Sequence, residues 1–144
     1  MHTALRVMAM LTAGVLGAIA LLHVYWGVGG RAARLGAVPE RDGRPVFEPS
    51  RAGTLAVAAA LVAAAALVAL GGRLVPNPAP AVATRVLVFC LGGVLVARAI
   101  GDFRLVGFFK SVRAGEFARL DTWLYSPLCL VLGIATLGIG YFNG

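Results

Sequence analysis

Hydrophobic positions fall into four long stretches, and most ionisable residues lie between them. The stretches cover residues 5–28, 53–72, 82–100 and 122–142, and none holds an acidic residue in its central two turns. Each is near the roughly 20 residues that cross about 30 Å of hydrocarbon. Because lipid offers the backbone no hydrogen bonds, such stretches form helices that pack together. The pattern predicts an all-α fold: a four-transmembrane-helix bundle forming a single integral membrane domain over residues 1–144.

Two of the connecting segments are long enough to fold. Residues 29–52 are rich in proline and contain a turn-like sequence at residues 41–44, which predicts a folded cap or a re-entrant loop. In the second segment, residues 101–121, apolar residues recur at helical spacing between positions 105 and 112. This spacing predicts a short interfacial helix before the fourth span. A plain linker with anchoring aromatic residues is the alternative.

Composition and charge narrow the possible partners of the protein and its orientation in the membrane. The chain is 60% apolar and 13% charged, with a net charge of +7. Its 13 basic residues form no run beside stacking aromatics, so we expect no nucleic-acid partner. Nine of them lie in the two longer segments and only three at the opposite face. Because short loops rich in Lys and Arg stay inside the cell, we expect residues 29–52 and 101–121 to be cytoplasmic. Both termini would then lie outside a bacterial cell membrane.

The first span has a competing interpretation. Arg6, the apolar run after it and the small residues 18–20 resemble a secretory signal peptide with a cleavage site. The apolar run continues beyond residue 20, which favours a membrane span.

His23 and Trp26 are the first candidates for chemistry. They lie three residues apart near the end of the first span, so they share a helix face, and Tyr25 lies beside them. A histidine here can exchange a proton with a ligand or simply bond to a backbone carbonyl. Further metal ligands are lacking nearby, and the two cysteines lie singly within spans. We therefore expect no metal, no cofactor and no disulfide exchange.

A second set of candidates lies at the ends of the third and fourth spans. Arg98 and Asp102 are four residues apart, so they can form an ion pair that ends the helix. Alternatively, Arg98 is an anion clamp, since an arginine at membrane depth is costly without a role. Asp121 is well placed as the N-cap of the fourth span, and Tyr125 follows on the same helix face.

The seven candidates all fall at the inner ends of spans 1, 3 and 4, which meet in a four-helix bundle. Polar groups at the mouth of an apolar bundle predict a pocket for an amphiphile, with its head at the interface and its tail between helices. A hydrogen-bonded plug that holds the helices together is the alternative. The ligand-binding candidates are His23, Tyr25, Trp26, Arg98, Asp102, Asp121 and Tyr125.

The chain also resembles an uncharacterised family of small four-helix bacterial integral membrane proteins, a domain of unknown function (DUF3995-like). The matching pieces are HVYWG at residues 23–27, GRPVF at residues 43–47, GDFR and GFFK at residues 101–104 and 107–110, and DTWLYSPLC at residues 121–129. The resemblance implies four membrane spans and brings no activity with it.

Three functions stay open. The first is binding, or acting on, a lipid or another hydrophobic small molecule at the inner ends of spans 1, 3 and 4; the sequence does not decide whether the protein is an enzyme. The second is a small transporter, although no carboxylate lies in the middle of a span to couple protons. The third is an accessory or structural subunit of a larger membrane complex. The expected partners are membrane lipid, the small-molecule ligand, and a second copy of the chain or another membrane protein.

Overall fold

The computed structural model describes residues 2–32, 35–41 and 44–142. Within them lie four helices long and apolar enough to span a membrane. Three are α1 (His2–Gly27), α2 (Arg51–Gly71) and α3 (Ala81–Ile100). The fourth, Glu116–Phe142, joins α4 (Glu116–Leu120), a π-helical turn η2 (Asp121–Tyr125) and α5 (Ser126–Phe142). The predicted all-α four-helix architecture is confirmed, and the chain is a multi-pass membrane protein.

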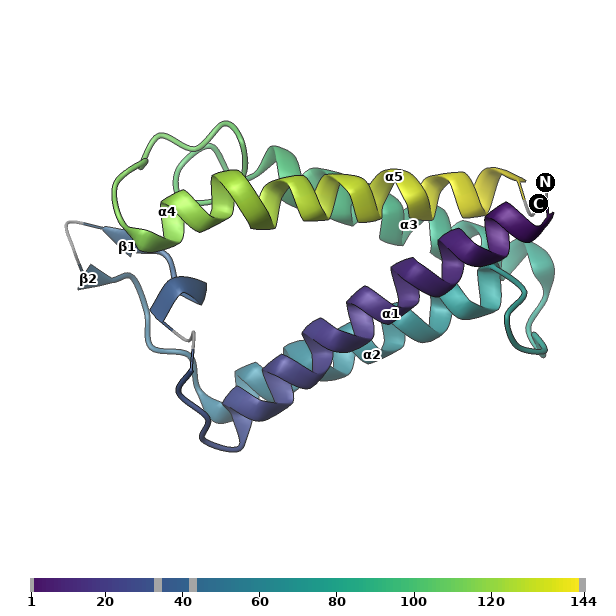
Figure 1. Ribbon diagram of the computed structural model, residues 1–144, viewed down its shortest axis with the longest axis horizontal. Helices are drawn as coiled ribbons and strands as arrows, with labels where there is room; N and C mark the ends of the chain where they lie inside the picture. The colour runs from purple at the N-terminus through teal and green to yellow at the C-terminus, as the bar shows by residue number, and fades with distance from the viewer. Residues whose placement is uncertain (1, 33–34, 42–43, 143–144) are drawn as a thin grey trace.

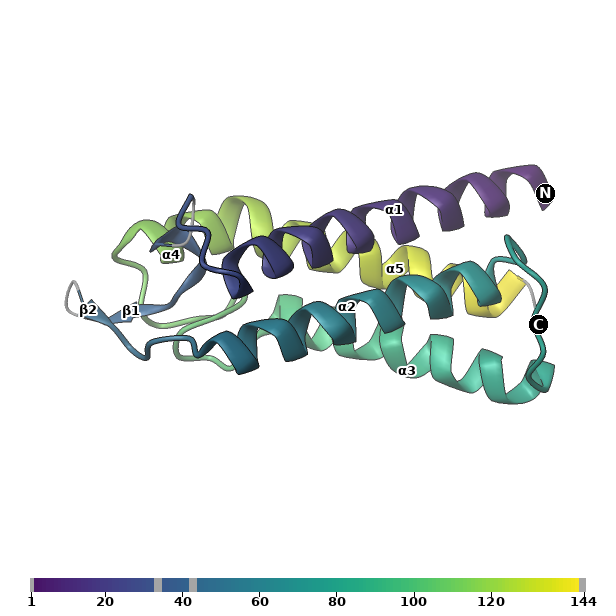
Figure 2. The same cartoon turned by 90° about the horizontal axis from the view of Figure 1, so that it is seen from below.

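The helices are arranged as two hairpins (Figures 1 and 2). Helix α1 packs along α2, and α3 packs along α5. The hairpins approach each other at the end that holds both chain termini and diverge toward the end with the two longer loops, here called the loop end (Figure 1). The buried hydrophobic core reflects this shape, because it draws on α1, α2, α3 and α5 mainly near the terminal end. Its buried members are Ala9, Leu16, Val68, Val88, Leu132 and Ile139.

Small residues allow the close packing within the second hairpin. A Cβ atom added at Gly133 would lie 3.0 Å from the backbone nitrogen of Val96 and 3.1 Å from the carbonyl oxygen of Gly92. A Cβ at Gly92 would lie 2.7 Å from Cγ of Leu137. Because lipid tails are as apolar as the helix surfaces, the hydrophobic effect does not drive the helices together. Close van der Waals contact between the helices holds the hairpin together instead.

The first longer loop is folded, as predicted. It contains a 3₁₀ turn, η1 (Leu35–Ala37), and two short antiparallel strands, β1 (Glu40–Arg41) and β2 (Arg44–Pro45). Both η1 and β1 lie against α4 (Figure 1). The centre of the turn predicted at residues 41–44 lies outside the described residues. The loop therefore bridges from the first hairpin to the start of the fourth span.

The helix predicted over residues 105–112 is absent, and that prediction was wrong. The segment 101–115 is irregular, and the short helix before the fourth span is α4, which continues directly into it. Gly101 and Gly107 adopt positive φ angles of 94° and 88°, and Phe103 has φ 62°. These left-handed residues break a helix. They fold the loop back on α3, where the backbone N–H of Phe108 donates to the carbonyl of Ala99 at 2.9 Å.

Candidate functional site

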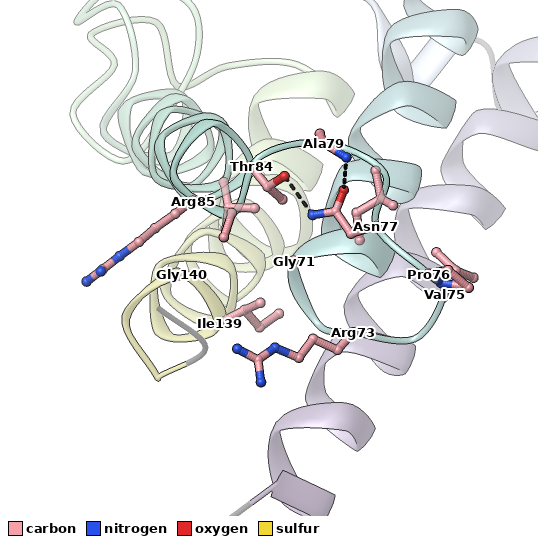
Figure 3. Close-up of a pocket in the computed structure, with 13 residues that line it drawn as sticks. Gly71, Arg73, Val75, Pro76, Asn77, Ala79, Thr84, Arg85, Ile139 and Gly140 are labelled. Carbon is pink, nitrogen blue, oxygen red and sulfur yellow. Dashed lines mark hydrogen bonds between the residues drawn. The ribbon is translucent and has the colours of Figure 1, made fainter.

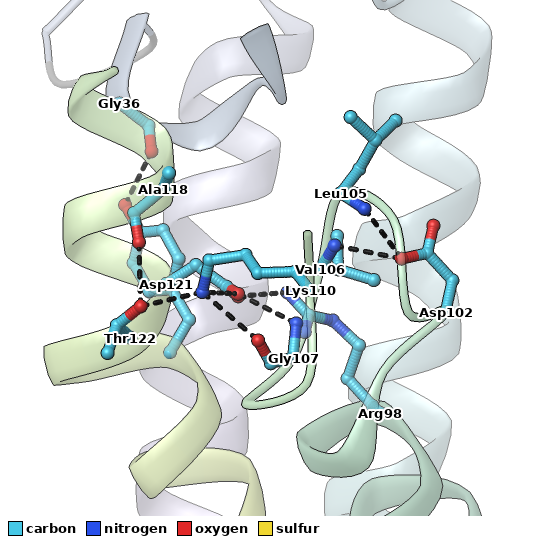
Figure 4. A network of polar contacts seen from close by, with 11 residues as sticks. Gly36, Arg98, Asp102, Leu105, Val106, Gly107, Lys110, Ala118, Asp121 and Thr122 are labelled. Atoms are coloured by element: carbon cyan, nitrogen blue, oxygen red, sulfur yellow. Dashed lines mark hydrogen bonds and ion pairs between the residues drawn. The ribbon is translucent and has the colours of Figure 1, made fainter. Parts of the chain in front are cut away.

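Asp121 is the centre of a buried polar cluster at the loop end of the second hairpin (Figure 4). Its carboxylate is fully buried. It accepts hydrogen bonds from Nη2 of Arg98 at 2.8 Å, the backbone N–H of Gly107 at 2.7 Å and Nζ of Lys110 at 3.0 Å. Two of these bonds are also ion pairs. Charge-assisted bonds of this kind tie α3, the second loop and η2 together.

Lys110 is the charged residue of this cluster that sequence reasoning missed. It is almost fully buried, and its ammonium group donates to Asp121, to the carbonyl of Gly107 at 3.0 Å and to Oγ1 of Thr122 at 2.6 Å. All three of its N–H donors are therefore used. The charge pattern counts it only among the basic residues of the second loop. The one available signal was that Lys110 is the only lysine of a chain otherwise basic through arginine. Arg98, Lys110, Asp121 and Thr122 are called the Asp121 cluster below.

Two local predictions about this region were wrong. Asp121 is not an N-cap, because the helix begins earlier, at Glu116, with Gly115 preceding it. Arg98 does not pair with Asp102 either, since its guanidinium donates to Asp121 instead. The reason is that Gly101, with its positive φ, turns the chain away from the helix immediately before Asp102.

Asp102 organises its own loop. Its Oδ1 accepts from the backbone N–H groups of Arg104, Leu105 and Val106 at 2.9, 2.7 and 3.0 Å. Desolvation on its own would raise the pKa of Asp102, but the donations from Val106, Arg104 and Leu105 outweigh it and lower the pKa below its ordinary value of 3.8. The carboxylate therefore stays charged at neutral pH and holds the turn that presents Gly107 to Asp121.

His23 and Trp26 lie in a different place, at the loop end of the first hairpin. Nδ1 of His23 lies 2.8 Å from the carbonyl oxygen of Ile19, so the ring bonds to the backbone of its own helix. The two rings pack edge to face with centroids 5.1 Å apart. Nε1 of Trp26 donates to the carbonyl of Ala32 at 2.7 Å. Together they form one wall of an open pocket of about 460 Å³.

This pocket, here called the His23 pocket, lies between the end of α1, the start of α2 and the first loop. Its apolar walls come from Trp26 and Phe47 and from smaller loop and helix residues. Its polar groups come from His23, Glu48 and the start of α2. The lining residues are His23, Trp26, Ala37, Val38, Phe47, Glu48, Pro49, Ser50, Gly53, Thr54 and Val57.

A second pocket, of about 390 Å³, lies at the opposite end of the molecule beside the turn between α2 and α3 (Figure 3). Nδ2 of Asn77 donates to Oγ1 of Thr84 at 2.8 Å, and Oδ1 of Asn77 accepts from the backbone N–H of Ala79 at 3.0 Å. The side chain of Asn77 therefore bonds to groups of the turn and of the start of α3. We interpret it as stabilising the turn, not as binding a ligand.

The seven sequence candidates consequently divide among several places. Arg98 and Asp121 meet in the Asp121 cluster, whereas His23 and Trp26 line the His23 pocket. The hydroxyl of Tyr125 donates to the carbonyl of Gly36 at 2.9 Å and so ties the fourth span to the first loop.

The remaining two candidates join neither group. Tyr25 is about half exposed and lies over Gly30. Asp102 faces its own loop. Among the residues that the structure describes, no group of three or more His, Cys, Asp or Glu side chains could hold a metal ion.

These features define a four-helix integral membrane protein with a buried ion-pair cluster and a separate aromatic pocket, both at its loop end. The chain belongs to the family described as Protein of unknown function (DUF3995), whose model matches residues 16–136. The matched region includes both the Asp121 cluster and the His23 pocket. No curated protein and no solved structure matches the chain.

Proposed function

We propose that this protein binds a lipid or another amphiphilic small molecule in the His23 pocket. The observation that carries the proposal is the pocket itself. Its volume of about 460 Å³ lies in the range of small-molecule sites, roughly 300–1,000 Å³. Apolar walls with a few polar groups are also typical of such sites. The pocket lies at the ends of spans 1 and 2, which replaces the expectation of one site shared by spans 1, 3 and 4.

The polar groups of the pocket favour a head group that donates hydrogen bonds. A carbonyl oxygen only accepts, so the short contact with Ile19 requires the proton on Nδ1 of His23. In the neutral ring, Nε2 is then an acceptor. The Glu48 carboxylate accepts as well. The Thr54 hydroxyl already donates, to the carbonyl of Ser50 at 2.9 Å, which leaves its lone pairs for a ligand.

The aromatic groups agree with this chemistry. The rings of Trp26 and Phe47 both line the pocket, and aromatic faces attract cations. We therefore expect an amphiphile whose head carries hydroxyl or ammonium groups, with its tail against the apolar walls of the pocket. The anionic head first expected at Arg98 has no place in this pocket, because Arg98 belongs to the Asp121 cluster.

The test is native mass spectrometry with lipid extraction on gently purified protein. His23→Phe keeps an aromatic side chain and removes both nitrogens, and Glu48→Gln keeps the size of an exposed side chain and removes its charge. His2→Phe is the matched control, because His2 is exposed at the other end of α1. We expect a defined molecule on the wild type and on His2→Phe, and its loss from both pocket variants.

Equal retention in all variants would refute the assignment of the pocket. A wild type that carries no molecule would refute binding and favour a transporter or a partner-dependent subunit.

The proposal includes an orientation, with the loop end in the cytoplasm, supported by the charge bias of the two longer loops. The test uses two exposed alanines, one in each type of loop, in a chain whose native cysteines are replaced. A membrane-impermeant maleimide should label Ala79→Cys in intact cells and Ala114→Cys only after permeabilisation. The reverse pattern would place the loop end outside.

A further inference from the structure

The Asp121 cluster carries an unbalanced charge. Arg98 and Lys110 both bond to the single carboxylate of Asp121. Lys110 and Asp121 are almost completely buried, and the side chain of Arg98 is one third exposed. A net positive charge in a poorly solvated place is costly unless an anion or a polar group compensates it. Among the described residues of the cluster, one carboxylate faces two positively charged side chains.

Arg98 in the cluster and Ser126, five residues after Asp121, each hold a donor that nothing in the described chain satisfies. Nη1 of Arg98 is buried and has no hydrogen-bond partner, and neither does the hydroxyl oxygen of Ser126, which is fully buried. Buried polar groups are nearly always bonded, and each exception calls for an explanation. Asp121 does not satisfy Nη1 of Arg98, because Oδ1 accepts from Nη2, Oδ2 accepts from Gly107 and Lys110, and Nη1 bonds to neither oxygen.

The π-helical turn connects Asp121 with Ser126. The backbone N–H of Ser126 donates to the carbonyl of Asp121, five residues earlier, so the two residues flank one widened turn. Pro127 explains the turn, because its ring lacks an N–H and crowds the carbonyl four residues before it. Single π-turns of this kind occur often at functional sites.

We infer that the Asp121 cluster is a binding site for one oxyanion, a carboxylate or a phosphate group. Nη1 of Arg98 and Oγ of Ser126 are the donors that receive it, and the partly exposed guanidinium is the point of entry. The anion balances the second positive charge and satisfies both unpaired donors together. This site is separate from the His23 pocket, and the inference does not depend on the proposed function.

Two sources offer this chemistry: the head group of an anionic lipid and a free anion in solution. The experiment measures the thermal unfolding midpoint of purified protein in two arms. The first arm adds inorganic phosphate or acetate, with chloride at equal ionic strength as reference. The second compares vesicles of phosphatidylglycerol with vesicles of phosphatidylcholine. Stabilisation by phosphate or acetate identifies a free anion, and stabilisation only by phosphatidylglycerol identifies a lipid.

Ser126→Ala is the decisive variant, because it removes a donor that has no partner among the described residues and so leaves the fold intact. Loss of a bond to a charged ligand should weaken anion binding about tenfold. Thr136→Val is the matched control: Thr136 is a buried hydroxyl on the same helix, already bonded to the carbonyl of Leu132 at 2.7 Å. Its anion response should equal that of the wild type.

Arg98→Gln should abolish the stabilisation by anions, but it also breaks the ion pair with Asp121. The result for Ser126→Ala therefore decides whether the anion site exists. The same anion response in Ser126→Ala and the wild type would overturn the inference. So would the absence of any anion-specific stabilisation in both arms, which would mean that buried water alone satisfies the two donors.

Discussion

Replacing Asp121 by asparagine should cost a large part of the stability of the protein. The substitution keeps the shape of the side chain but removes the carboxylate with which both Arg98 and Lys110 pair. In the wild type three N–H donors, from Arg98, Gly107 and Lys110, point at the carboxylate oxygens. The NH₂ group of asparagine would face at least one of these donors and could not accept its bond. Breaking a buried ion pair by removing one partner typically costs about 3–5 kcal/mol. Total stabilities are about 5–15 kcal/mol, so Asp121→Asn should unfold far more readily.

The assay is equilibrium unfolding in mixed detergent micelles, with the midpoint followed by circular dichroism. Asp102→Asn is the matched control, because it is the same change at an exposed carboxylate that accepts only backbone N–H groups. Asparagine can still accept these bonds through its amide oxygen, so Asp102→Asn should lose only the smaller contribution of the exposed charge. The double variant Asp121→Asn with Lys110→Met should recover part of the loss, since it also removes a buried positive charge.

If Asp121→Asn proves as stable as Asp102→Asn, the ion pairs of the cluster contribute little and the reasoning fails. A double variant that loses the full sum of the two single changes would contradict the charge-balance argument.

Three further predictions follow from single contacts. Gly107→Ala should destabilise the protein by more than about 1 kcal/mol, because alanine would have to adopt φ 88° and its Cβ would meet the backbone of Gly101. In the control Gly93→Ala the added Cβ meets nothing within 4 Å, so this variant should unfold at the wild-type midpoint or above. Tyr125→Phe should release the first loop by removing the bond to Gly36, worth about 0.5–1.5 kcal/mol, and limited proteolysis of the loop at residues 44–50 should become faster; an unchanged cleavage rate would argue against this tie. The lowered pKa of Asp102 means that its carboxylate stabilises the fold fully above pH 3.8, and that this contribution is lost as pH falls through the lower folded-state pKa. Unfolding midpoints of wild type and Asp102→Asn should therefore converge below pH 3.8, and a constant difference would contradict the shift.

Sequence reasoning succeeded where a property depends on residues close together in the chain. The four spans followed from hydrophobic length alone, because a membrane forces any such segment to satisfy its backbone as a helix. The shared face of His23 and Trp26 likewise followed from a spacing of three residues, and the structure places both in one pocket wall. The bond from His23 to a backbone carbonyl was one of the two interpretations open for it.

Sequence reasoning failed where local spacing and long-range contact compete. Arg98 lies four residues from Asp102 and 23 from Asp121, yet it bonds to the distant carboxylate. In the sequence Lys110 is one of several basic residues of the second loop, yet its side chain is buried against Asp121. Asp121 suited the N-cap of the fourth span, but the helix begins at Glu116 and widens into a π-turn at Asp121–Tyr125.

The sequence by itself thus determined the class of this protein, its four helices and the residue types gathered at its loop end. Only the tertiary structure decided that these residues form two separate sites, the His23 pocket and the Asp121 cluster. The physical reason is that the length of a hydrophobic stretch can be counted along the sequence. A buried charge instead pairs with whichever group the folded chain brings close to it. That choice depended on the path of the second loop, which left-handed residues at Gly101, Phe103 and Gly107 direct back onto the third helix.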